Sequence, residues 1–200
     1  MLVFFHVPHT GGRNVGRCLW HLNTPHRRVH QARDFQALEK GSHTNYFILR
    51  DPIQRAHKEF VHYSRRLIEA GRVNHLTLDD FSGLDPQNPE HYFGLEVNRN
   101  VYCKFLLSAR EPRDFSRPIT REDLKWLKEN VPKRFRFDHF TQLPHLPVLE
   151  KILGHPVKLP VTTPVTFGDG GNPAEISEKT QPLLEKANEF DIELVKFLQQ

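Results

Sequence analysis

The sequence lacks several features that would assign it to a membrane or secretory class. No apolar run approaches the roughly 20 residues of a membrane-spanning helix, although 38% of the 200 residues are hydrophobic. The first apolar run is about five residues long and has no basic segment before it, unlike a secretory signal peptide. Two cysteines are too few for a disulfide framework. We therefore expect a single soluble domain, residues 1–200, in the reducing cytoplasm.

A common phosphate-binding motif is also missing, because no Gly-Lys-Ser/Thr triplet follows a glycine-rich loop. Residues 3–15, VFFHVPHTGGRNV, nevertheless read as a strand, a tight glycine turn and the start of a helix over 13–22. Such a turn directs backbone N–H groups and the positive end of a helix dipole at one point. The stretch therefore predicts a site for a phosphate or a sulfate.

Positive charge is concentrated in the N-terminal part of the chain. Residues 1–75 hold 12 Lys and Arg against 5 Asp and Glu, a balance of +7, whereas residues 76–200 hold 16 against 19, a balance of −3. This distribution predicts that the N-terminal part binds an anion. Nucleic acid and a multiply charged nucleotide are both candidates, and the glycine turn favours the nucleotide.

A second strand-to-helix turn is predicted within residues 47–60, FILRDPIQRAHKEF. An apolar strand over 45–50 ends in a charged residue, and Asp51-Pro52 then opens a helix in the preferred way. Asp is a favoured N-cap, and Pro is favoured in the first turn. The helix is expected to run to residue 70 and to end at Gly71.

Three cations lie around this second turn. Arg50 ends the strand, and Arg55 and Lys58 are three residues apart on the helix, so they share a face near its first turns. Arg can hold a phosphate with two hydrogen bonds, and Lys adds a point charge. Two anion sites, each at a strand-to-helix turn, suit a nucleotide with both 3′- and 5′-phosphates.

The rest of the pattern alternates helices with a further strand. Helices are expected over 92–107, 120–131, 145–153 and 174–198, a strand over 135–140, and loops over 23–45, 83–91 and 155–173. Strands that alternate with helices predict a single α/β domain with a mainly parallel sheet. Ligands of such sheets bind at the carboxyl ends of the strands, so both turns are expected to face one site.

The two motifs together resemble those of sulfotransferases that use 3′-phosphoadenosine 5′-phosphosulfate (PAPS). Residues 4–15, FFHVPHTGGRNV, resemble the 5′-phosphosulfate loop, and residues 47–60 resemble the 3′-phosphate-binding motif. The resemblance is to the uronyl 2-O-sulfotransferase-like branch of carbohydrate sulfotransferases and its bacterial relatives. Residues 119–154 and 186–198 look like the family's downstream helix–strand–helix segment and terminal helix.

The resemblance implies a P-loop-like three-layer fold that transfers a sulfuryl group from PAPS to a hydroxyl acceptor, expected to be a carbohydrate, with 3′-phosphoadenosine 5′-phosphate (PAP) as product. It implies that the following residues cradle the 5′-phosphosulfate: Pro8, His9, Thr10, Gly11, Gly12, Arg13 and Asn14. Arg50 would bind the 3′-phosphate. Lys58 stands where the family usually has a Ser that also contacts this phosphate, and Lys can replace that contact.

The chain departs from the family at His9, where the family has a Lys that stabilises the leaving phosphate. Histidine, with an unperturbed pKa of about 6.5, is only partly charged near neutral pH. Bound phosphates would favour its charged form. Arg13 and Asn14 replace the usual Thr and Ser, and Arg13 would return a cation to the loop.

The resemblance also implies a general base between the two motifs, where the 2-O-sulfotransferase branch uses a His. The matching stretch is VHQARDF (29–35), which makes His30 the expected base and His26 its alternative. These two histidines are four residues apart and could hold a metal on a helix. Pro25 and the lack of a third ligand argue against this, so no metal is expected.

Two other functions are compatible with the sequence. The change at His9 suits a pseudoenzyme that binds PAP or PAPS without transferring the sulfuryl group. A basic nucleic-acid-binding protein is less favoured, because the charge gathers at two turns rather than along one helix face. We therefore expect a hydroxyl-bearing acceptor as the partner, with neither nucleic acid nor a membrane.

Overall fold

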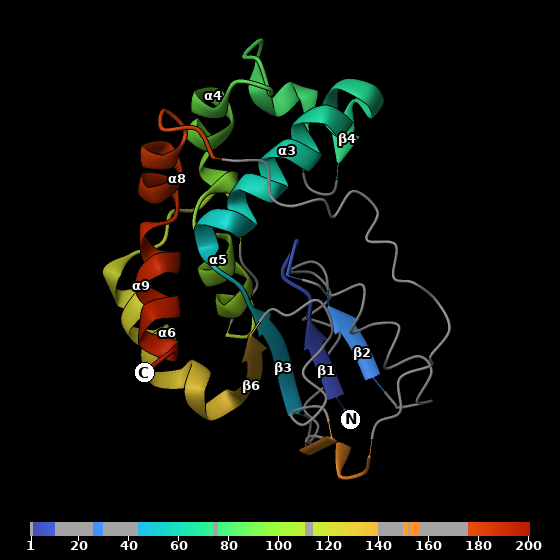
Figure 1. The fold of residues 1–200 in the computed structure, drawn as a ribbon, viewed down its shortest axis with the longest axis vertical. Coiled ribbons are helices and arrows are strands. Elements are labelled where there is room, and N and C mark those ends of the chain that lie inside the picture. Colours follow the sequence, from blue (N-terminus) through green and yellow to red (C-terminus); the bar gives the residue numbers. More distant parts are fainter. Residues whose placement is uncertain are drawn as a thin grey trace.

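The described strands form a four-stranded parallel sheet, and in Figure 1 the described helices lie to one side of it and above it. The computed structural model describes residues 2–10, 26–29, 44–73, 76–110, 114–139, 150–151, 153–156 and 176–200. The strands of the sheet are β1 (Leu2–Phe5), β2 (His26–Val29), β3 (Thr44–Leu49) and β6 (Phe135–His139), in the order β2-β1-β3-β6. Each neighbouring pair is parallel, which confirms the predicted α/β class with a mainly parallel sheet.

The two central strands are apolar because both of their faces are covered. Val3 and Phe5 of β1 and Phe47 of β3 face one core, where they pack with the helices of one layer. Phe4 and Tyr46, which alternate with them, are also buried. Near-continuous apolar runs of this kind are typical of parallel strands that are buried on both faces.

Helix α3 (Pro52–Ala70) begins directly after β3 and lies beyond the carboxyl ends of the strands (Figure 1). Its start is fixed by Asp51, whose Oδ1 accepts a hydrogen bond from the Gln54 N–H at 2.8 Å. Its end is fixed by Gly71, which takes a left-handed φ of 70° and donates its N–H to Leu67 O. Both boundaries confirm the prediction from the capping residues.

The other described elements form two groups around α3. They are β4 (Arg72–Val73), β5 (Leu76–Thr77), η1 (Leu78–Phe81), α4 (Pro89–Gly94), η2 (Glu96–Asn98), α5 (Val101–Leu107), α6 (Arg121–Arg134), α8 (Gln181–Ala187) and α9 (Glu189–Leu198). Helices α5, α6 and α9 pack on one face of the sheet. Helices α3, α4 and α8 enclose a second core together with the β4–β5 hairpin.

Two predicted helices were wrong in their extent. The segment 92–107 is interrupted, because α4 ends at Gly94 and Asn100 takes a left-handed φ of 48° before α5 begins. The segment 174–198 is divided at Asn188 into α8 and α9. The predicted loop 83–91 also contains the start of α4, which Asn88 caps.

The predicted loop 23–45 was wrong at residues 26–29, which form strand β2 and pair with β1. Other predictions on the elements agree with the structure or cannot be compared with it. The predicted helix 120–131 and strand 135–140 correspond to α6 and β6. The predicted helix 13–22 lies outside the described residues, as do most of the predicted helix 145–153 and loop 155–173. No helix in the described part of the chain combines the length and the apolarity that are needed to cross a membrane.

Candidate functional site

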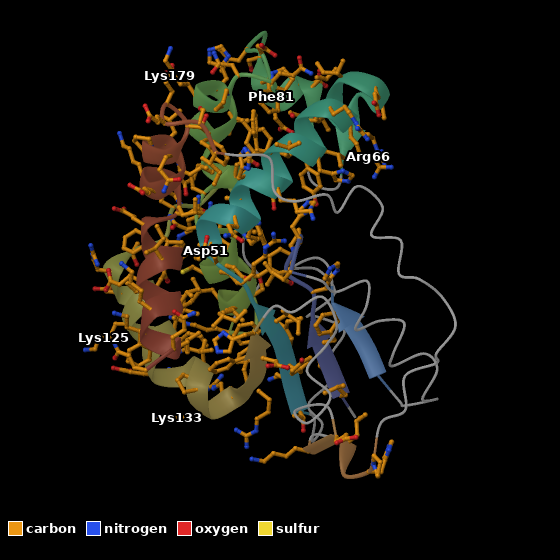
Figure 2. The ribbon with its side chains drawn as sticks, viewed as in Figure 1. Asp51, Arg66, Phe81, Lys125, Lys133 and Lys179 are labelled. Carbon is orange, nitrogen blue, oxygen red and sulfur yellow. The ribbon has the colours of Figure 1, made fainter. Side chains whose placement is uncertain are left out.

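The candidate site lies where the order of the strands reverses. The chain passes from β1 to β2 on one side of β1 and then returns to its other side as β3. In open parallel sheets, the crevice at such a reversal, at the carboxyl ends of the strands, is the usual place for a ligand. The turns after β1 and β3 meet there, and Figure 2 shows Asp51 at the point where β3 passes into α3.

The turn after β1 is tightly folded over its described part. Val7 N–H donates to Phe5 O at 3.1 Å, and the buried Thr10 donates its hydroxyl to Val7 O at 2.8 Å. His9 takes a φ of 64°, a left-handed conformation that few residues other than glycine adopt. The strained backbone suits a functional turn, since such conformations cluster at binding sites.

Three residues of the predicted 5′-phosphosulfate loop belong to this described turn. They are Pro8, His9 and Thr10. The other four, Gly11, Gly12, Arg13 and Asn14, lie outside the described residues.

Arg50 connects the two predicted motifs. Its guanidinium Nη1 donates a hydrogen bond to His9 O at 2.9 Å. Its backbone N–H donates to the hydroxyl of Tyr102 at 2.7 Å. The structure therefore brings the turn after β1 and the turn after β3 into direct contact, as parallel neighbours allow.

Lys58 lies close to Arg50 on the second turn of α3. Burial of the side chain and the neighbouring Arg50 charge both lower the pKa of Lys58 below its ordinary value. Within the described residues, Lys58 makes no hydrogen bond or ion pair. Two like charges held together in a half-buried site favour an anion between them, because the anion would relieve their repulsion.

Arg55 was expected to share a face of the helix with Lys58, but its side chain is turned into the protein interior. It is fully buried, and its Nη1 donates to Glu59 Oε2 at 2.5 Å. Burial lowers the pKa of Arg55, but the carboxylates of Glu59 and Asp191 raise it more, so the net shift is upward. Arg55 therefore forms a buried ion pair with Glu59 within α3, and it is not available to bind a phosphate.

The ring of His9 is half-buried against α3. It packs edge-on against His62 and Tyr63, with ring centroids 5.4 and 5.1 Å away. Burial, followed by the positive charges of Arg55 and other nearby residues, lowers the pKa of His9 to about 3. In the free site the imidazole is therefore neutral near pH 7. The expectation that bound phosphates favour its charged form concerns the loaded site and stays a prediction.

The predicted general base cannot be placed. His30 lies outside the described residues. His26, the alternative base, begins strand β2 and pairs with Leu2, so its backbone lies at the amino ends of the strands, away from the site, and this alternative was wrong. In the parts of the chain that the structure describes, no group of three or more His, Cys, Asp or Glu side chains could hold a metal ion.

The sequence analysis did not identify two buried residues, Tyr102 and Asp191, whose hydrogen bonds hold Arg50 in place. Tyr102 holds the Arg50 backbone, and Asp191 holds the helix that carries Tyr102. Tyr102 lies in an apolar segment that reads only as core. The only signal for Asp191 was its place in the segment 186–198, which resembles the family's terminal helix.

No protein-family model and no curated protein matches this sequence. The function must therefore be inferred from the chemistry of the site.

Proposed function

We propose that this chain is a PAPS-dependent sulfotransferase of P-loop-like fold, which transfers a sulfuryl group from PAPS to a hydroxyl, with a carbohydrate as the expected acceptor. The observation that carries the proposal is the pair of cations at the strand reversal. Arg50 lies against the turn after β1, and Lys58 makes no hydrogen bond or ion pair within the described residues. Such a pair fits a phosphate group, since Arg and Lys both form charge-assisted hydrogen bonds to phosphate oxygens.

The two phosphate positions of PAPS match the two turns. Arg50 and Lys58 would hold the 3′-phosphate, and the N–H groups of residues 9–14 would orient the 5′-phosphosulfate. PAPS supplies an activated sulfuryl group, whose bond to the 5′-phosphate breaks as the acceptor oxygen bonds to sulfur. The electron pair of that bond leaves with the phosphate, and Arg13 would stabilise the charge that develops there. His30 would take the proton of the acceptor hydroxyl.

A second candidate function is binding of PAP or PAPS without transfer. The specific observation that favours it is the neutral, half-buried ring of His9, at the position where the resemblance implies a permanently charged Lys. A neutral imidazole can donate a hydrogen bond to the leaving group, but it adds no positive charge. The fold and the cation pair would then serve recognition alone.

Transfer of labelled sulfate from PAPS to a panel of carbohydrates separates the two candidates. We expect turnover by the unaltered chain and a higher rate for His9→Lys, because an ammonium would supply the charge that the neutral ring lacks. A lower rate for His9→Lys would show that the site is built around histidine. Binding of PAP with no turnover by either protein would favour the second candidate.

A further inference from the structure

The hydroxyl of Tyr102 completes the hydrogen bonding at the carboxyl end of β3. It accepts the Arg50 N–H at 2.7 Å and donates to Ile48 O at 3.3 Å. These are the two bonds that a residue of another parallel strand would make on either side of Leu49. β1 ends before this point, since its last paired residue, Phe5, lies opposite Phe47. The Tyr102 side chain thus extends the hydrogen bonding of β3 as far as Arg50, whose guanidinium belongs to the site.

Tyr102 is itself held rigidly. Its side chain is fully buried, and its backbone N–H donates to Asp191 Oδ2 at 2.9 Å. The other carboxylate oxygen of Asp191 accepts the Cys103 N–H at 2.9 Å, so both oxygens cap the first turn of α5. The Arg55 guanidinium lies over the Tyr102 ring, 5.8 Å from its centroid. These contacts fix the position of the Tyr102 hydroxyl that binds the Arg50 N–H.

The backbone of Arg50 determines where its guanidinium lies. The residue is bound at two points, because the backbone N–H meets Tyr102 and the side-chain Nη1 meets His9 O. Loss of the first bond would free the backbone at the junction with α3, while the capping of α3 by Asp51 would remain. The guanidinium would then spend less time in the geometry that a phosphate requires.

We propose that Tyr102 is a positioning residue of the anion site, which orients Arg50 for a 3′-phosphate through the hydrogen bond to its backbone. This inference rests on the proposed nucleotide site. It assigns to Tyr102 no contact with the ligand. It predicts that the hydroxyl contributes selectively to recognition of the 3′-phosphate, and that binding of the rest of the nucleotide does not depend on it.

Calorimetric titration of Tyr102→Phe with PAP and with AMP tests this inference. AMP lacks the 3′-phosphate, so the ratio of the two affinities isolates the contribution of the Arg50 side of the site. We expect Tyr102→Phe to lose about three- to tenfold in PAP affinity, the range for one hydrogen bond, with less than about a twofold change for AMP. The ratio of PAP to AMP affinity should fall accordingly.

Tyr92→Phe is the matched control, since its hydroxyl is also buried but has no hydrogen-bond partner within the described residues. It should leave the affinity ratio unchanged. An unchanged ratio in Tyr102→Phe, or an equal fall in Tyr92→Phe, would overturn the positioning role while leaving the nucleotide site intact. Absence of PAP binding by the unaltered chain would overturn the proposed function together with this inference.

A second variant covers the case in which Tyr102→Phe does not fold, which thermal unfolding would reveal. Replacement of Tyr102 by 4-aminophenylalanine keeps a donor for Ile48 O but provides a poor acceptor for the Arg50 N–H. The affinity ratio is again expected to fall, and an unchanged ratio would again contradict the positioning role.

Discussion

At the scale of single residues, the backbone of His9 and its ring have separate roles. The left-handed backbone turns the His9 carbonyl toward Arg50, which binds it. The half-buried ring points to α3, where it contacts His62 and Tyr63. A single residue thus joins the two motifs through its carbonyl and contributes a neutral imidazole to the free site.

The half-buried imidazole makes stability depend on pH. The pKa of His9 is about 3 in the folded chain and about 6.5 in the unfolded chain. Between these values the unfolded chain binds more protons, so the free energy of unfolding falls as the pH is lowered through this window. Above pH 6.5 this contribution is fully present.

His9→Asn should reduce this acid sensitivity, because Asn does not titrate and tolerates a left-handed backbone. Urea unfolding between pH 7.5 and 4.5 measures the effect. The slope of the free energy of unfolding against pH should be smaller in the variant, by up to about 1.4 kcal/mol per pH unit. The other histidines are common to both proteins, so parallel pH profiles would contradict the neutral state of His9.

At the scale of elements, α5 and α9 cap each other. Asp191, in the first turn of α9, accepts the N–H groups of Tyr102 and Cys103 at the start of α5. Asn100, which precedes α5, accepts the N–H of Phe190 with its side-chain Oδ1. Hydrogen bonds therefore join the N-termini of α5 and α9 to each other. The Asp191 carboxylate also interacts favourably with the positive end of the α5 dipole.

Asp191→Ala should destabilise the fold by about 3–5 kcal/mol, because it leaves the α5 cap open and removes a buried carboxylate near Arg55. Chemical denaturation measures this loss. Glu193→Ala, on the same helix, is the control: its salt bridges with Arg121 and Lys128 lie at the surface, so their loss should cost less than about 1 kcal/mol. Equal effects of the two substitutions would show that the buried cap adds no stability.

The boundaries that the sequence could predict are those with local signals. Asp51, Pro52 and Gly71 determine both ends of α3 through contacts within a few residues. The break at Asn100 has no such local cause, because its side chain accepts the N–H of Phe190 on a distant helix. The bond from Tyr102 to Asp191 joins residues 89 positions apart, and the bond from Asp191 to Asn100 joins residues 91 positions apart. Contacts of this kind become visible only when the helices have been placed.

At the scale of the whole molecule, the topology turns two separate motifs into one site. The sequence predicted a mainly parallel sheet, and both turns were expected at the carboxyl ends of strands. The sequence did not show that β1 and β3 are neighbours in the sheet. This pairing, which brings Arg50 into contact with His9, became known only from the order of the strands. Residues three apart on a helix differ in direction by about 60°. That difference is enough to bury Arg55 while Lys58 stays half-buried. The spacing of the two residues in the sequence could not show which of them would be buried.

Titration of the unaltered chain with PAP, followed in a calorimeter, tests the nucleotide site most directly. We predict saturable binding that Arg50→Ala weakens by about 1.5–3 kcal/mol, the range for a hydrogen bond to a charged group. Arg66→Ala removes the same charge from an exposed position further along α3 and should leave the affinity unchanged (Figure 2). No binding of PAP, together with tight and salt-dependent binding of DNA, would contradict the account.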